Sequence, residues 1–205
     1  MIKIAHAVKT LTDAKKAIES SFDLLETDIS QNILSGKFVI QHNGITGKLG
    51  IGQNLDNLLN SKFRNKLVLD LKHAKYSLNY QRKLNNLLKE EKVKNVKITG
   101  LDLKIISEIA KENNGEVYYG FLNNKSINLF FNSLTQIYEP SGFSIKAELV
   151  NKDLVQKLKS KFPKAQIWAW TVNYQTEIKR LQKLKVDGII TDLWRSCVLE
   201  IVTKI

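Results

Sequence analysis

Residues 166–192 read QIWAWTVNYQTEIKRLQKLKVDGIITD and contain the pattern from which the fold follows. They begin with an apolar run, 166–172, whose length and composition are typical of a strand buried on both faces. Apolar residues at helical spacing follow over 175–184, and a second short apolar run occupies 188–191. A strand, a helix and a second strand in this order indicate a βαβ unit of a parallel sheet.

The same alternation fills the rest of the chain. Short runs rich in Val and Ile predict strands at 2–6, 24–30, 66–72, 95–99, 117–122 and 143–149, with an extended run at 37–42 beside the second of them. Segments with helical spacing predict helices at 11–20, 54–60, 77–91, 102–113, 125–134 and 152–162, and a closing helix at 193–204. If the extended run is counted with the second strand, the chain contains eight β/α units, the pattern of a (β/α)8 TIM barrel.

We therefore expect one α/β domain over residues 1–205, a compact single barrel with little or no capping insertion. The 205 residues lie at the lower end of the size range of this fold. No Pro-rich, Ser-rich or Gly-rich linker divides the chain. A doubly wound open sheet is the alternative, but it would place a Gly-rich phosphate loop after the first strand, where residues 6–10 contain no Gly.

Composition indicates an ordinary globular protein, with 43% hydrophobic and 25% charged residues. A single cysteine, Cys197, excludes a disulfide framework and a cysteine-based zinc site. No stretch approaches the roughly 20 apolar residues that cross a bilayer, and the N-terminus reads as a strand and not as an export signal. These features predict a cytoplasmic protein without a transmembrane segment.

The net charge of +12 attracts anions such as phosphate esters, nucleic acid or anionic lipid. No Arg-rich or aromatic-interleaved stretch marks a nucleic-acid surface, so no specific nucleic-acid partner is expected. We interpret the positive charge mainly as a feature that keeps the protein in solution and weakly attracts anionic ligands. The oligomeric state remains open.

Carboxylates lie near the C-terminal ends of two predicted strands, where a barrel carries its active site. Glu26 and Asp28 are two residues apart on one strand, so their side chains point to the same face. Asp70 and Lys72 repeat this spacing on the next barrel strand. Close carboxylates repel unless a cation lies between them, and oxygen ligands favour Mg²⁺ or Ca²⁺ over zinc. The alternative is structural, with Asp28 capping a turn and Glu26 meeting a lysine.

Two of the three histidines, His6 and His42, end predicted strands. One such histidine is weak evidence, because it is often structural. Two imidazoles beside a phosphate can act as base and acid, one removing a proton from the attacking hydroxyl while the other protonates the leaving oxygen.

At these positions the sequence resembles the glycerophosphodiester phosphodiesterase family of (β/α)8 barrel enzymes, and it is also similar to the venom-type phospholipase D barrels. The motifs occur in the order of the family, from the first strand to the last. They are His6, Leu-Glu-Thr-Asp at 25–28, Val-Ile-Gln-His at 39–42, Leu-Asp-Leu-Lys at 69–72, Trp-Thr-Val-Asn at 170–173 and Val-Asp-Gly-Ile-Ile-Thr-Asp at 186–192.

The resemblance implies a metal-dependent phosphodiesterase that cleaves a small glycerophosphodiester to an alcohol and glycerol phosphate, with a cyclic phosphate as a possible intermediate. One divalent cation, Mg²⁺ or Ca²⁺, is implied as cofactor. The implied roles are acid and base for His6 and His42, metal ligands for Glu26, Asp28 and Asp70, a phosphate contact for Lys72, and an aromatic wall for the alcohol at Trp170.

Three positions depart from the usual pattern of the family. Ala7 stands where an arginine usually follows the first histidine, and Asn43 stands where an aspartate usually follows the second. The third metal ligand is the shorter Asp70, where glutamate is common. Two alternatives therefore remain beside hydrolysis: a degenerate barrel that binds an anionic phosphoester, and a phospholipase D-like enzyme that cyclises lysophospholipids.

Overall fold

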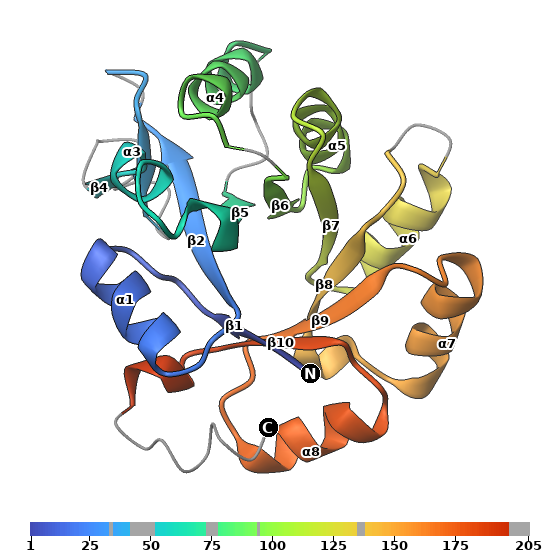
Figure 1. Cartoon of the computed structure of the whole chain (residues 1–205). Helices are drawn as coiled ribbons and strands as arrows, with labels where there is room; N and C mark the ends of the chain where they lie inside the picture. The colour runs from blue at the N-terminus through green and yellow to red at the C-terminus, as the bar shows by residue number, and fades with distance from the viewer. Residues whose placement is uncertain (33–34, 42–51, 73–77, 94, 135–137, 197–205) are drawn as a thin grey trace.

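The computed structural model describes residues 1–32, 35–41, 52–72, 78–93, 95–134 and 138–196. Within this part of the chain, eight parallel strands form a closed barrel (Figure 1). The ring closes because β1 pairs with β10 on one side and with β2 on the other. The strands are β1 (Ile2–Ala5), β2 (Leu24–Gln31), β5 (Leu67–Leu71), β6 (Lys97–Gly100), β7 (Glu116–Phe121), β8 (Gly142–Lys146), β9 (Gln166–Trp170) and β10 (Gly188–Thr191).

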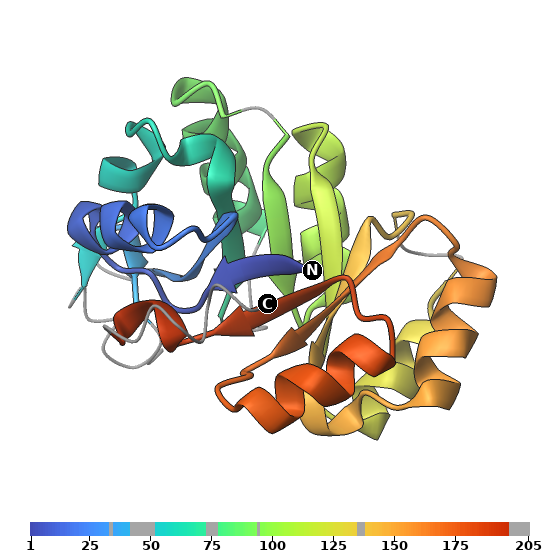
Figure 2. The same ribbon diagram turned by 60° about the horizontal axis from the view of Figure 1, so that its bottom comes forward.

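Helices surround the barrel and cover its outer face (Figures 1 and 2). They are α1 (Leu11–Glu19), α3 (Asp56–Leu59), α4 (Leu78–Glu90), α5 (Leu103–Glu112), α6 (Asn124–Asn132), α7 (Lys152–Lys161) and α8 (Gln175–Lys183). Side-chain caps fix where several of them begin. The Thr10 hydroxyl accepts from the Asp13 amide, and the Asp13 carboxylate accepts from the Thr10 amide, so α1 starts in a capping box. The TIM-barrel prediction is confirmed.

The second β/α unit is irregular. Strand β3 (Phe38–Ile40) pairs antiparallel with the C-terminal end of β2, and β4 (Gln53–Asn54) pairs antiparallel with β3. The described part of the extended run predicted at 37–42 is therefore an antiparallel partner of the second barrel strand and not a barrel strand of its own. A 3-10 turn, η1 (Arg64–Lys66), leads into β5.

Most predicted element ends lie within two residues of the observed ends, and two elements differ more. The strand predicted at 143–149 ends at Lys146 and continues as a 3-10 turn, η2 (Ala147–Leu149), because Arg180 donates to the carbonyls of Ala147 and Val150 at 2.8 and 2.6 Å. The helix predicted at 193–204 begins as a 3-10 turn, η3 (Leu193–Arg195), which is held against the barrel mouth by side-chain bonds described below. Residues 197–204 of that prediction lie outside the described residues.

Side chains alternate along the strands between two apolar layers. The larger layer packs between strands and helices. The smaller fills the barrel interior with Ile4, Val68, Tyr118, Trp168 and Ile190. Leu24 of β2 packs against this layer. Alternate residues of a strand share a face, so the residues two positions after Ile4 and Val68, and two and four positions after Leu24, also face the interior, nearer its C-terminal mouth. The sequence thereby aims His6, Asp28 and Asp70 into one space.

A stacked aromatic pair forms the floor below this space. The Tyr118 and Trp168 rings lie 3.6 Å apart between centroids at an interplanar angle of 17°. Gly142 makes room for the pair, since a Cβ there would lie 2.5 Å from the Tyr118 ring.

None of the helices in the described ranges is long and apolar enough to cross a membrane.

Candidate active site

Three carboxylates converge at the mouth of the barrel. Glu26 and Asp28 come from β2, and Asp70 comes from β5, whose register with β2 places it directly opposite Asp28. One oxygen from each residue lies within 4.8 Å of the other two. Glu26 and Asp28 are buried, each with 2% of its surface exposed. The sequence fixes the shared face of Glu26 and Asp28, and the strand pairing adds Asp70.

This cluster fits a divalent cation. Burial raises the pKa of Glu26 well above its ordinary value, and the charges of Asp28 and Asp70 raise it further. Burial likewise raises the pKa of Asp70, although Lys72 opposes this shift. Three oxygen ligands that repel one another in a buried site match the donor set that Mg²⁺ and Ca²⁺ prefer. These three residues are the ones that would hold the ion.

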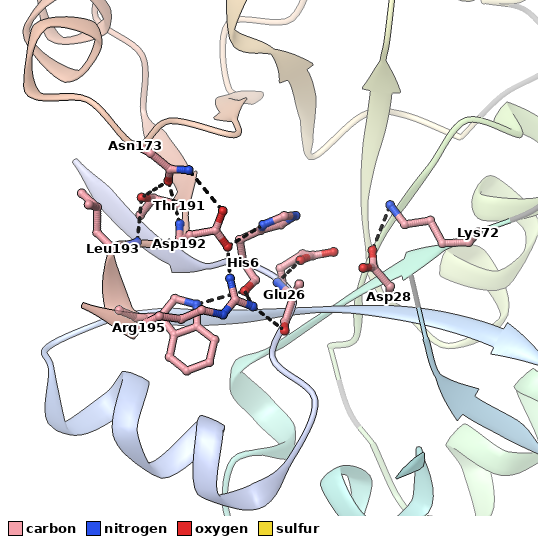
Figure 3. Close-up of polar contacts among 11 residues, drawn as sticks. His6, Glu26, Asp28, Lys72, Asn173, Thr191, Asp192, Leu193 and Arg195 are labelled. Atoms are coloured by element: carbon pink, nitrogen blue, oxygen red, sulfur yellow. Dashed lines mark hydrogen bonds and ion pairs between the residues drawn. The ribbon is translucent and has the colours of Figure 1, made fainter. Parts of the chain in front are cut away.

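Lys72 lies directly beside two of the carboxylates. Its Nζ is 2.9 Å from Asp28 Oδ1 (Figure 3). It also contacts the Asp70 carboxylate. Burial disfavours the ammonium form, but Asp70, Asp28 and Glu26 outweigh this effect and raise the pKa of Lys72. The side chain therefore keeps its positive charge at the position where an anionic substrate would approach the cluster.

His6 follows β1 and is oriented by a carboxylate from the other end of the chain. Its Nδ1 lies 3.0 Å from Oδ1 of Asp192, the residue after β10. Because a carboxylate only accepts hydrogen bonds, this contact assigns the proton to Nδ1 and makes Nε2 the basic nitrogen of the neutral ring. Asn173 supports Asp192 by donating from Nδ2 to Oδ2 at 3.1 Å and accepting from the Asp192 amide at 2.9 Å.

Arg195 also joins this network (Figure 3). Its guanidinium contacts Asp192 and donates to the carbonyls of His6 and Ala7, both at 2.9 Å. On the other side of the same loop, the Ala7 amide donates to Glu26 Oε2 at 2.7 Å. These bonds hold Ala7 at a positive φ of 51°, an uncommon conformation for a residue with a side chain. Arg195 thus fixes the loop after β1.

A cavity of about 270 Å³ lies over these groups. His6, Glu26, Asp70, Lys72 and Trp170 line it, together with the hydroxyl-bearing residues Thr99 and Ser144. Trp170 ends β9 and contributes an aromatic wall. A phosphate ester in this cavity would meet a histidine, an ammonium group and the carboxylate cluster at once.

The structure brings together six of the seven residues proposed from the sequence. The seventh, His42, lies outside the described residues. Gln41, the residue before it, donates its backbone amide to the Asp28 carbonyl at 2.9 Å. The described range 35–41 therefore ends beside the backbone of a residue of the carboxylate cluster.

No role was predicted from the sequence for five further residues of the site: Thr99, Ser144, Asn173, Asp192 and Arg195. Position after a predicted strand was a usable signal for Asp192, which directly follows the run 188–191. Arg195 offered no such signal, because its bonds to the carbonyls of His6 and Ala7 join segments 189 and 188 positions apart in the chain.

Comparisons with known proteins bear on the family and the fold. A sequence profile described as the glycerophosphoryl diester phosphodiesterase family matches residues 53–194. A comparison with curated proteins found no match.

Solved structures share the fold at low sequence identity. A candidate glycerophosphoryl diester phosphodiesterase from Silicibacter pomeroyi DSS-3 has a TM-score of 0.78 and 14% identity, covering 100% of this chain and 93% of its own. A glycerophosphodiester phosphodiesterase from Thermotoga maritima has a TM-score of 0.73 and 17% identity, with 95% and 96% coverage. An Oleispira antarctica phosphodiesterase in complex with the product sn-glycerol-3-phosphate has a TM-score of 0.71 and 12% identity, with 99% and 97% coverage.

Proposed function

The chain belongs to the glycerophosphoryl diester phosphodiesterase family, and on this premise we propose the reaction that it catalyses and the residues that carry it out. It is a phosphoric diester hydrolase of the glycerophosphodiester type. We propose that it cleaves a small glycerophosphodiester to an alcohol and glycerol phosphate. The product bound in the Oleispira antarctica phosphodiesterase supports a small-molecule substrate of this kind.

One observation carries this proposal: two members of the carboxylate cluster, Glu26 and Asp70, line a single cavity at the barrel mouth together with the oriented His6. A protein that only bound an anion would have no use for a histidine held in a defined tautomer by Asp192. This argues against the degenerate barrel suggested by Ala7.

In the proposed reaction, His6 Nε2 exchanges a proton with either the attacking hydroxyl or the leaving oxygen, and His42 serves the opposite end of the reacting phosphorus. Lys72 binds a phosphate oxygen and stabilises the charge that grows there in the transition state. Trp170 packs against the alcohol. A divalent cation held by Glu26, Asp28 and Asp70 would supply further stabilisation of the charged phosphate. A hydroxyl of the substrate as nucleophile would give a cyclic phosphate, and water would give glycerol phosphate directly.

Phosphorus NMR tests this proposal. The protein is incubated with glycerophosphocholine, glycerophosphoethanolamine and lysophosphatidylcholine, with Mg²⁺ or Ca²⁺ and in parallel with a chelator. We expect a phosphomonoester or cyclic phosphate signal that requires the cation. Unchanged diesters under all conditions would contradict the proposal, and a persistent cyclic phosphate would identify a cyclising enzyme.

We also propose a cytoplasmic location, which the single cysteine supports because such composition suits a reducing compartment.

Glu26→Gln is expected to stabilise the chelated protein at neutral pH while abolishing activity. A carboxyl group with a raised pKa binds its proton more tightly in the folded protein than in the unfolded chain, so its contribution to stability falls as the pH rises through the raised pKa. Removing the buried charge should raise Tm by about 2–4 °C, the effect of about 1 kcal/mol in a chain of this size.

Thermal melts of the wild type and of Glu26→Gln check this result. They are recorded between about pH 4 and 8 in steps of roughly one pH unit, because carboxyl groups with raised pKa values titrate in this range. The advantage of Glu26→Gln should disappear as the pH falls below the raised pKa. It should reverse at neutral pH with saturating Mg²⁺ or Ca²⁺, since only the wild type keeps all three ligands. A variant less stable than the wild type in chelator at neutral pH would contradict the assigned cause.

Asp192→Asn is expected to lower kcat roughly 10- to 100-fold with little change in KM, because it weakens the group that orients His6 without touching the phosphate. Steady-state kinetics measure this split. Asp13→Asn is the matched control: it removes the carboxylate of the capping box of α1, so it should cost about 1 kcal/mol of stability and leave kcat unchanged. An equal loss of kcat in both variants would point to a general folding defect.

A further inference from the structure

A second cavity adjoins the first at the barrel mouth. It measures about 510 Å³, compared with about 270 Å³ for the cavity over the carboxylates. The two share a wall made of Asp70, Lys72, Thr99, Ser144 and Trp170. A ligand whose phosphate contacts Lys72 can therefore extend into the second cavity without leaving the protein surface.

The outer part of the second cavity is apolar. Leu101 directly follows β6 and Leu122 directly follows β7, and both line the cavity. Their side chains remain 46% and 42% exposed. A single exposed leucine is ordinary on a protein surface, but two at the mouth of one cavity beside Trp170 form an apolar wall that a ligand can cover.

The carboxyl groups that line this cavity already have partners in the protein. Asp102 Oδ1 caps α5 by accepting from the Ile105 amide at 3.1 Å, and Asp70 contacts Lys72. A small cationic alcohol bound in this cavity would need a carboxylate as counter-charge and would have to displace one of these existing contacts. An aliphatic chain needs no such partner and would remove the exposed surface of both leucines from water.

We propose that the second cavity binds an aliphatic chain carried by the phosphodiester, so that the preferred substrate is a monoacylated glycerophosphodiester and not its deacylated counterpart. This inference rests on the proposed function, since it assumes that the phosphate lies over the carboxylates. Leu101 and Leu122 are then specificity-determining residues, and neither takes part in the chemistry.

Kinetics with two substrates that differ only in the chain test the proposal. These are glycerophosphocholine and hexanoyl lysophosphatidylcholine, the latter kept below its micelle-forming concentration. We expect the wild type to have a kcat/KM about tenfold or more higher for the acylated substrate. In a double variant, Leu101→Gln with Leu122→Gln, this preference should disappear while activity on glycerophosphocholine stays within about twofold. Leu129→Gln, on α6 and 53% exposed, is the matched control and should change neither value.

Binding provides a readout that does not depend on turnover. Isothermal titration calorimetry compares sn-glycerol 3-phosphate with its hexanoyl ester. We expect the ester to bind about tenfold more tightly to the wild type and equally to the double variant. If neither diester is turned over, the proposed function fails, and calorimetry alone then tests whether the second cavity binds the aliphatic chain. Equal binding of the two phosphates by the wild type, or equal kcat/KM for the two diesters, would overturn the inference and leave the phosphodiesterase proposal standing.

Discussion

His6→Ala is expected to lower kcat/KM for glycerophosphodiesters by roughly a hundredfold or more, the usual effect of removing a general acid or base. The structure gives the reason, because the Asp192 carboxylate 3.0 Å from Nδ1 leaves Nε2 to exchange the proton. The limb of the pH profile that reports this group should disappear. Steady-state kinetics over pH provide the measurement, and an unchanged Tm shows that the variant is folded.

Combining His6→Ala with His42→Ala extends this prediction to the residue outside the described part of the chain. If the two histidines act as a pair, the double variant should be barely worse than either single variant. Losses that multiply would mean that the histidines act independently. A His6→Ala enzyme within threefold of the wild type would remove His6 from the chemistry, and this factor is far below the range of roughly 100 to 10,000 expected for acid–base catalysis.

Lys72→Met is expected to cost on the order of 3 kcal/mol of transition-state stabilisation, or roughly 150-fold in kcat, as removal of an oxyanion donor does. The same substitution should tighten cation binding, because the ammonium beside Asp28 and Asp70 competes for the carboxylates that hold the ion. Kinetics at saturating cation give the first effect, and calorimetric titration with Mg²⁺ or Ca²⁺ gives the second.

Lys159→Met is the control for Lys72→Met. Lys159 makes a comparable ion pair with Asp187 at 2.8 Å, but Asp187 precedes β10 and so lies at the end of the barrel opposite the cavity. Its loss should leave kcat unchanged. If Lys72→Met altered cation affinity alone, Lys72 would be a counter-charge for the carboxylates and not a phosphate ligand.

The sequence by itself determined the type and order of the elements and the faces on which key residues lie. Apolar periodicity is a local property, so the strand and helix patterns of residues 166–192 could be read without any tertiary contact. The two-residue spacing of Glu26 and Asp28 likewise fixes a common face by strand geometry alone. The predicted ends of elements were less accurate at 143–149 and 193–204. In these regions Arg180, Trp194 and Arg195 donate to backbone carbonyls of distant segments.

Only the tertiary structure decided which of these residues meet. The closure of the ring between β1 and β2 and the register that sets Asp70 opposite Asp28 come from packing of strands far apart in the chain. Asp192 reaches His6 across 186 sequence positions. Arg195 reaches Ala7 across 188. No local pattern encodes such contacts, because their free energy arises only once the barrel has closed and excluded water from its mouth.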